Sequence, residues 1–105
     1  DGVSKWRRAA KVDKNQGQIV KALRKIRGVT VQTGMDDILV GYTGADGIPK
    51  TYWYELKEPE KVSKKTGELL ESAIKPSQIK LRDTWKGHYS IVWSLDQILA
   101  ELGIK

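Results

Sequence analysis

The sequence contains no cysteine, a single histidine and no long run of apolar residues. A chain without cysteine forms no disulfide and binds no metal through thiolates, which fits a reducing compartment. No apolar segment approaches the ~20 residues that a membrane-spanning helix needs, and no secretory hydrophobic region is visible. We therefore expect a cytoplasmic protein that does not interact with membranes.

The composition is that of a globular domain with a basic surface. The chain has 105 residues, of which 39% are hydrophobic and 30% are charged, enough for one domain with a modest core. The 19 Lys and Arg residues exceed the 13 Asp and Glu residues, and the net charge is +6. Such a balance favours an anionic partner, most often nucleic acid. A lysine-rich surface without such a partner is the alternative.

Residues 1–14 are basic and contain one tryptophan, which is typical of an N-terminal arm. We expect Arg7, Arg8 and Lys11 to contact phosphates, and Trp6 is a candidate for stacking on a base. A solvated tail is the alternative. Residues 15–105 then form the one folded domain.

The rest of the chain alternates between helical and strand-like segments. Apolar residues recur at helical spacing in some segments, and β-branched residues alternate with polar ones in others. The segment between the third and fourth strands is long enough for a parallel crossover. The pattern predicts an α/β fold with a mixed central sheet flanked by helices, in the order α-β-β-β-α-β-α. We expect helices at 15–27, 76–86 and from 95 onward, and strands at 29–33, 37–43, 51–58 and 88–94.

Two helix patterns predict local contacts. Asn15 followed by Gln18 resembles a capping box at the start of the first helix. In the second helix, Gln78, Leu81 and Trp85 recur at positions i, i+3 and i+7. Residues with this spacing lie on one face of a helix, so we expect these three side chains to form its inward stripe.

The charged segment 59–75 follows the third strand and contains a glycine. It predicts a mobile loop with a short helical piece at 68–73, and loops of this length are often functional. Three of its lysines could follow a phosphate backbone, although a solvated loop is equally compatible with the pattern. These lysines are Lys61, Lys64 and Lys65.

Acidic residues open the second strand and close the third. Asp36 and Asp37 begin the second strand, and Glu55, Leu56 and Lys57 end the third. Residues two apart in a strand share a face, so Glu55 and Lys57 point the same way and Asp37 can meet Glu55 if the strands pair. Two carboxylates and a cation at one point favour a divalent metal site for phosphodiester hydrolysis. Turn residues and an ordinary exposed charge pair are the alternatives.

These segments, in this order and context, resemble the PD-(D/E)XK nuclease superfamily. The first helix is followed by GMDDILV at 34–40, ELK at 55–57 and PSQ at 76–78. More closely, the chain is similar to the VRR-NUC (virus-type replication-repair nuclease) family, which occurs as small stand-alone phage proteins and as the nuclease module of larger DNA-repair enzymes. The resemblance covers residues 15–102 and implies a restriction-endonuclease-like core.

The resemblance implies roles for five side chains. Asp37 matches the aspartate of the P-D pair, Glu55 the second acidic ligand, and Lys57 the lysine of the motif. Gln78 matches the glutamine of the helix that follows. Gln18 stands where the first helix of the family often has a glutamate.

The chain departs from the family at two of these points. Asp36 replaces the usual proline, and Gln18 is uncharged where a glutamate is common. Mg²⁺ and Mn²⁺ prefer hard oxygen ligands. The resemblance therefore implies a metal held by Asp37, Glu55 and the backbone carbonyl of Leu56, with water and a substrate oxygen completing the shell.

The expected function is metal-dependent, structure-specific cleavage of branched DNA. The resemblance to stand-alone family members implies a Holliday-junction-resolving endonuclease that acts as a homodimer, because two symmetric cuts need two sites. The dimer surface could use the aromatic strand residues or the outer helices. Two alternatives stay open: a nucleic-acid-binding module with a degenerate nuclease fold, and a nuclease for flaps or single-stranded ends. The family also suggests a phage source and the cytoplasm of the host cell.

Overall fold

The computed structural model describes residues 14–34 and 37–104. Arg7, Arg8 and Lys11 of the expected arm, together with Trp6 and Asp36, lie outside these ranges. The order of elements confirms the predicted α-β-β-β-α-β-α pattern. In chain order they are α2 (Lys14–Arg24), β1 (Val29–Thr33), β2 (Asp37–Thr43), β3 (Pro49–Leu56), the 3₁₀ helices η1 (Pro59–Lys61) and η2 (Glu71–Ala73), α3 (Pro76–Thr84), β4 (Ser90–Val92) and α4 (Leu95–Leu102).

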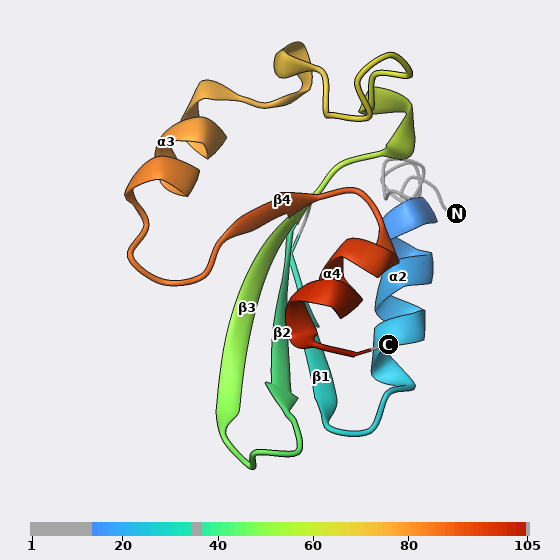
Figure 1. The fold of residues 1–105 in the computed structure, drawn as a ribbon, viewed down its shortest axis with the longest axis vertical. Helices are drawn as coiled ribbons and strands as arrows, with labels where there is room; N and C mark the ends of the chain where they lie inside the picture. Colours follow the sequence, from blue (N-terminus) through green and yellow to red (C-terminus); the bar gives the residue numbers. More distant parts are fainter. Residues whose placement is uncertain (1–13, 35–36, 105) are drawn as a thin grey trace, which may run out of the picture.

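The four strands form one mixed sheet in the order β1-β2-β3-β4. β1, β2 and β3 pair antiparallel through two short connections. β4 returns beside β3 in parallel, after the long crossover that contains α3 (Figure 1). The expected parallel crossover and mixed sheet are therefore confirmed.

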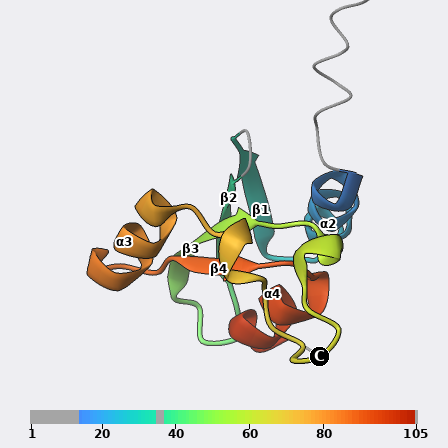
Figure 2. The same cartoon turned by 90° about the horizontal axis from the view of Figure 1, so that it is seen from above.

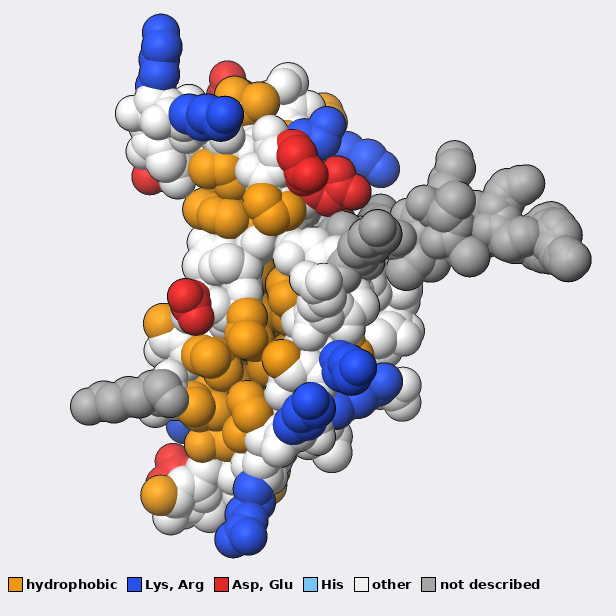
Figure 3. Space-filling view, turned by 90° about the vertical axis from the view of Figure 1, so that its right-hand side faces the viewer, with side chains coloured by type: hydrophobic (Ala, Val, Ile, Leu, Met, Phe, Trp, Pro, Cys, Tyr) orange, Lys and Arg blue, Asp and Glu red, His pale blue; other side chains and the backbone are white. Residues whose placement is uncertain are grey.

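The core lies between one face of the sheet and helices α2 and α4 (Figures 1 and 2). Alternate residues of each strand point to this face. The buried apolar side chains are Ile19, Val20, Leu23, Val29, Ile38, Val40, Tyr54, Leu56, Val92, Ile98 and Leu102. On the outside, the helical side shows an apolar patch next to basic side chains (Figure 3).

Helix α3 lies apart from α2 and α4, beyond β4 (Figures 1 and 2). None of its residues is buried, and Trp85, which directly follows it, is 51% exposed. The predicted inward stripe is therefore right only in part: Gln78 and Leu81 are half-buried, whereas Trp85 lies beyond the end of the helix and is exposed. The Trp85 ring packs edge-on against the ring of Trp53, with the centroids 5.3 Å apart.

The predicted capping box of the first helix is also wrong. Helix α2 already begins at Lys14, so Asn15 lies inside its first turn. The Asn15 side-chain amide instead donates to the backbone carbonyls of Lys57 (3.4 Å) and Trp93 (3.2 Å). Asn15 thus ties α2 to the ends of β3 and β4. The helix stops at Arg24, three residues earlier than expected.

Local hydrogen bonds connect parts of the segment 59–75, for which we expected a mobile loop with a short helical piece. Val62 and Leu69 form an antiparallel bridge, and the Ser63 amide donates to the Glu68 carbonyl at 2.8 Å. Of the helical piece expected at 68–73, only η2 is present. Figure 1 shows this segment arching over one end of the sheet, from the end of β3 to α3.

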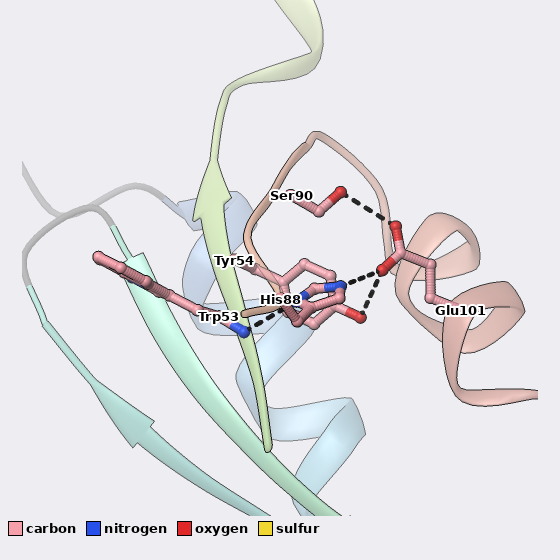
Figure 4. Close-up of polar contacts among 5 residues, drawn as sticks. All are labelled: Trp53, Tyr54, His88, Ser90 and Glu101. Carbon is pink, nitrogen blue, oxygen red and sulfur yellow. Dashed lines mark hydrogen bonds and ion pairs between the residues drawn. The ribbon is translucent and has the colours of Figure 1, made fainter. Parts of the chain in front are cut away.

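A hydrogen-bond network around the Glu101 carboxylate joins α4 to β3 and β4 (Figure 4). The Tyr54 hydroxyl (3.1 Å) and the Ser90 hydroxyl (3.0 Å) donate to this carboxylate. His88 accepts the Trp53 backbone N–H at Nδ1 (3.1 Å). Its ring proton therefore lies on Nε2, which contacts Glu101. Burial, and then the Glu101 charge, raise the pKa of Tyr54, so its hydroxyl stays a donor.

The network predicts that Glu101→Ala destabilises the fold. The change removes the acceptor of the buried Tyr54 hydroxyl, so we expect the free energy of unfolding to fall by about 2 kcal/mol. Urea denaturation followed by circular dichroism measures this value. Glu60→Ala, at an exposed position of η1, serves as the control and should change stability by less than about 0.5 kcal/mol. Equal effects of the two changes would contradict the prediction.

Candidate active site

Asp37 and Glu55 lie directly opposite each other in the pairing of β2 with β3. Opposed residues of an antiparallel pair share a face, with Cβ atoms about 5 Å apart. The Lys57 Nζ lies 3.9 Å from the Glu55 Oε2, and both side chains are largely buried. The expectation that the two acids meet with a lysine beside them is therefore confirmed.

Two neighbours fix the position of Asp37. The Trp53 indole N–H donates to the Asp37 Oδ2 at 2.9 Å, and the Gly34 amide donates to the Asp37 backbone carbonyl at 2.8 Å. A Cβ at Gly34 would lie 2.2 Å from the Asp37 Oδ1. Only glycine therefore leaves this carboxylate where it is.

Backbone contacts hold the strand end that carries Lys57. The Lys57 amide donates to the Val92 carbonyl at 2.9 Å, and Asn15 donates to the Lys57 carbonyl. These contacts come from β4 on one side and from α2 on the other. Because the backbone is held on both sides, Glu55 and Lys57 keep a common orientation toward the face that carries Asp37.

Tyr89 stands beside this carboxylate pair with an unsatisfied hydroxyl. Within the described ranges, its oxygen is the one buried side-chain polar atom without a hydrogen-bond partner. Burial, and then the charges of Glu55 and Asp37, raise the pKa of Tyr89 to about 12, while Arg82 opposes the shift. The phenol therefore stays protonated at neutral pH and is a donor without an acceptor.

Sequence reasoning missed Tyr89 and Trp53 as parts of the site. The ring of Tyr89 packs edge-on against Trp53, with centroids 4.9 Å apart. The alternation of side chains along the strands could have identified both residues. Trp53 lies two residues before Glu55, so it shares the face of the acids. Tyr89 bears the same relation to Ile91, the β4 partner of Glu55.

The two glutamines suggested by the resemblance lie on helices α3 and α2. The Gln78 Oε1 accepts the Lys75 amide at 3.1 Å, so it completes the cap of α3. Gln18 is exposed one turn after Asn15, on the same side of α2. The buried amide of this helix is Gln16, which is 6% exposed.

The lysines of the 59–75 segment are exposed near the same end of the sheet. Lys64 and Lys65 lie in the turn that the Val62–Leu69 bridge closes, and Lys61 directly precedes it. The Ser63 hydroxyl accepts the Lys65 amide at 3.2 Å and so helps to hold this turn. Two of the three cations therefore project from a structured turn, and the third projects from the end of η1.

The donor set at the acids suits a hard divalent cation. Within residues 14–34 and 37–104, no group of three or more His, Cys, Asp or Glu side chains is arranged to hold a metal ion. Mg²⁺, however, is usually bound through one or two carboxylates together with water and substrate phosphate. Asp37, Glu55 and the Leu56 carbonyl would supply that kind of oxygen set.

Comparison with known proteins identifies no family, because no family model, curated protein or solved structure matches the chain. In the described ranges, no helix combines the length and apolarity needed to cross a membrane. The geometry of the site and the sequence pattern are therefore what support a function.

The close approach of Gly34 to Asp37 predicts a selective defect. In Gly34→Ala, the new methyl group pushes the Asp37 carboxylate aside while the backbone stays in place. Misplaced supporting groups cost about 10–100-fold in metal affinity, and we expect a loss of that size for Mn²⁺ in calorimetric titration. Gly17→Ala is the control, because its Cβ meets nothing within 4 Å and alanine favours a helix. Equal Mn²⁺ affinity in the two variants would contradict the prediction.

The unsatisfied hydroxyl of Tyr89 predicts an unusual stability effect. Tyr89→Phe removes a buried polar atom without a partner, so we expect stability to stay constant or to rise by about 1 kcal/mol. Tyr54→Phe is the matched control, since it deletes a hydroxyl that is bonded to Glu101, and it should lower stability by about 1 kcal/mol. Thermal denaturation distinguishes the two variants. A larger loss in Tyr89→Phe than in Tyr54→Phe would show that the Tyr89 hydroxyl has a structural partner.

Proposed function

We propose that this protein is a metal-dependent endonuclease that hydrolyses phosphodiester bonds in branched DNA. The observation that carries the proposal is the Asp37–Glu55 pair with the Lys57 ammonium group beside it. The net charge of +6 supports a polyanionic substrate. The mixed sheet with helices also agrees with the restriction-endonuclease-like core that the sequence resemblance implies.

The site would divide the chemistry between the acids and the lysine. Asp37, Glu55 and the Leu56 carbonyl would hold Mg²⁺ or Mn²⁺. When bound, such a metal neutralises charge on the phosphate and lowers the pKa of a bound water. Lys57 would orient the attacking water and stabilise the charge that develops on the phosphate oxygens. The pairing with Glu55 keeps the ammonium group directed toward this point.

Neighbouring side chains would support this arrangement. Trp53 holds one oxygen of Asp37 through its indole N–H, which restricts the rotation of the carboxylate. Tyr89 offers a protonated hydroxyl next to both acids. It would become a donor to a phosphate or sugar oxygen of the substrate once the side chains that cover its buried oxygen move aside.

The proposal includes a homodimer that acts on four-way junctions. One domain presents one pair of acids, whereas symmetric cleavage of a junction requires two sites at a fixed separation. A dimer with two-fold symmetry supplies them. Lys61, Lys64 and Lys65, exposed near the same end of the sheet as the acids, are the candidate contacts to the DNA arms.

A second candidate function is DNA binding without cleavage. Two observations favour it: the described site has two acidic side chains, and Gln18 is uncharged and exposed. A site with few anionic ligands binds a divalent cation weakly. The basic surface would then be the functional part of the molecule.

Cleavage of a labelled four-way junction separates these two functions. In Mg²⁺ or Mn²⁺, wild type should give paired, symmetric nicks, and Asp37→Asn should give none. We expect Lys57→Ala to lower the cleavage rate by about 100-fold, because it removes a charge that stabilises the transition state. Lys50→Ala is the matched control, since Lys50 pairs with Asp46 at the opposite end of the sheet.

Linear duplex and flap substrates of the same sequence complete this experiment. Equal rates on all three substrates would contradict the structure-specific part of the proposal. Tight junction binding without cleavage in either metal would favour the DNA-binding alternative. A Lys50→Ala defect as large as that of Lys57→Ala would mean that general loss of charge, rather than the site, explains the effect.

A further inference from the structure

A cavity of about 560 Å³ lies on the same face of the sheet as the acids, between β4, α3 and the 68–74 segment. Its apolar lining includes side chains from each of these elements. They are Leu69, Ile74, Ile79, Ile91 and Trp93. These apolar side chains share the walls with charged and polar groups. A space of this size with both kinds of wall suits a flat organic ring that has polar edges.

The cavity begins one strand away from the acids. Ile91, in its wall, is the direct β4 partner of Glu55, which in turn pairs with Asp37. Neighbouring strands lie about 5 Å apart, so the three residues form one row across the sheet. Tyr89 links the cavity to the acids. Its side chain lines the cavity, and the charges of Glu55 and Asp37 raise the pKa of its hydroxyl.

The charges around the cavity discriminate between parts of a nucleotide. Glu68 and Glu71 line it on the side of the arching segment, where they repel a phosphate but accept hydrogen bonds from amino groups. Carboxylates accept such bonds from the exocyclic amines of bases. Arg82 is the cation that lines the cavity. Its charge lowers the pKa of Tyr89, so it lies on the side of the cavity that faces the acids. The arrangement suits a neutral base inside the cavity and its phosphate outside.

We propose that this cavity binds an unpaired nucleobase whose phosphate lies at the Lys57 ammonium group, beside Asp37 and Glu55. The inference rests on the proposed nuclease function and deepens it, because it makes an unpaired nucleotide at the cut site part of the substrate. A paired base cannot enter, since its hydrogen-bonding edge is occupied and it is stacked in the duplex. Trp93 provides the aromatic surface on which the base stacks.

Binding of two oligonucleotide duplexes tests the proposal. One duplex carries a single unpaired 2-aminopurine, a fluorescent base, and the other is identical but fully paired. In EDTA, which prevents hydrolysis, wild type should bind the unpaired substrate more tightly and quench its fluorescence. Loss of one base-stacking contact corresponds to a decrease of about 5- to 100-fold in affinity. We expect Trp93→Leu to show a decrease of that size for the unpaired substrate alone.

Two further variants keep the test independent of folding. Ile79→Trp narrows the cavity from α3 and should reduce the quenching. Trp85→Leu removes a tryptophan that is 51% exposed and does not line the cavity, so quenching should persist. Unchanged quenching in Ile79→Trp, or equal affinity of wild type for both duplexes, would overturn the proposal.

The outcome is separable from that of the nuclease assay. Quenching that depends on Ile79 without any cleavage in Mg²⁺ or Mn²⁺ would refute the nuclease function and support the base-binding cavity. Cleavage without a preference for the unpaired substrate would support the nuclease function and refute the base-binding cavity.

Discussion

The register between β2 and β3 is the constraint on which the rest of the structure depends. Because side chains alternate along a strand, one register places Ile38 and Tyr54 in the core and Asp37 and Glu55 on the opposite face. A slip of one residue in either strand would put an acid into the core and separate the pair. The apolar core therefore positions the acids: burial of one face selects the register, and the register brings the two carboxylates together on the other.

Trp53 connects the Glu101 network with the candidate active site. Its backbone N–H donates to His88, which contacts the Glu101 carboxylate of α4, and its indole N–H donates to Asp37. One residue of β3 thus takes part in a structural network on the core side and in the candidate active site on the other. Hydrogen bonds to a common residue restrict both ends at once, so the orientation of Asp37 depends on contacts made by the C-terminal helix.

Local sequence patterns predicted the sheet well, because strand alternation is a strong signal when one face is buried. The bounds of β1 and β2 and the meeting of Asp37 with Glu55 agree with the structure. What failed depended on tertiary packing. Asn15 looked like a cap, but its amide bonds to the ends of two strands. Gln78, Leu81 and Trp85 have the predicted spacing, but α3 lies in the crossover outside the core, and none of its residues is buried. The contributions of Trp53 and Tyr89 became visible only once distant strands were paired.

The parallel edge strand β4 has only three residues, which affects the order in which parts of the fold are expected to open. Three residues provide few ladder hydrogen bonds, so β4 by itself is a weak attachment. Its position beside β3 depends on the carboxylate of Glu101 and on the Asn15 amide that reaches Trp93. Loss of α4 would therefore release β4 and Tyr89 before the β1–β3 meander opens. The acids lie in the longer β2–β3 pairing, whereas the wall of the cavity beside them includes the short β4, which we expect to detach first.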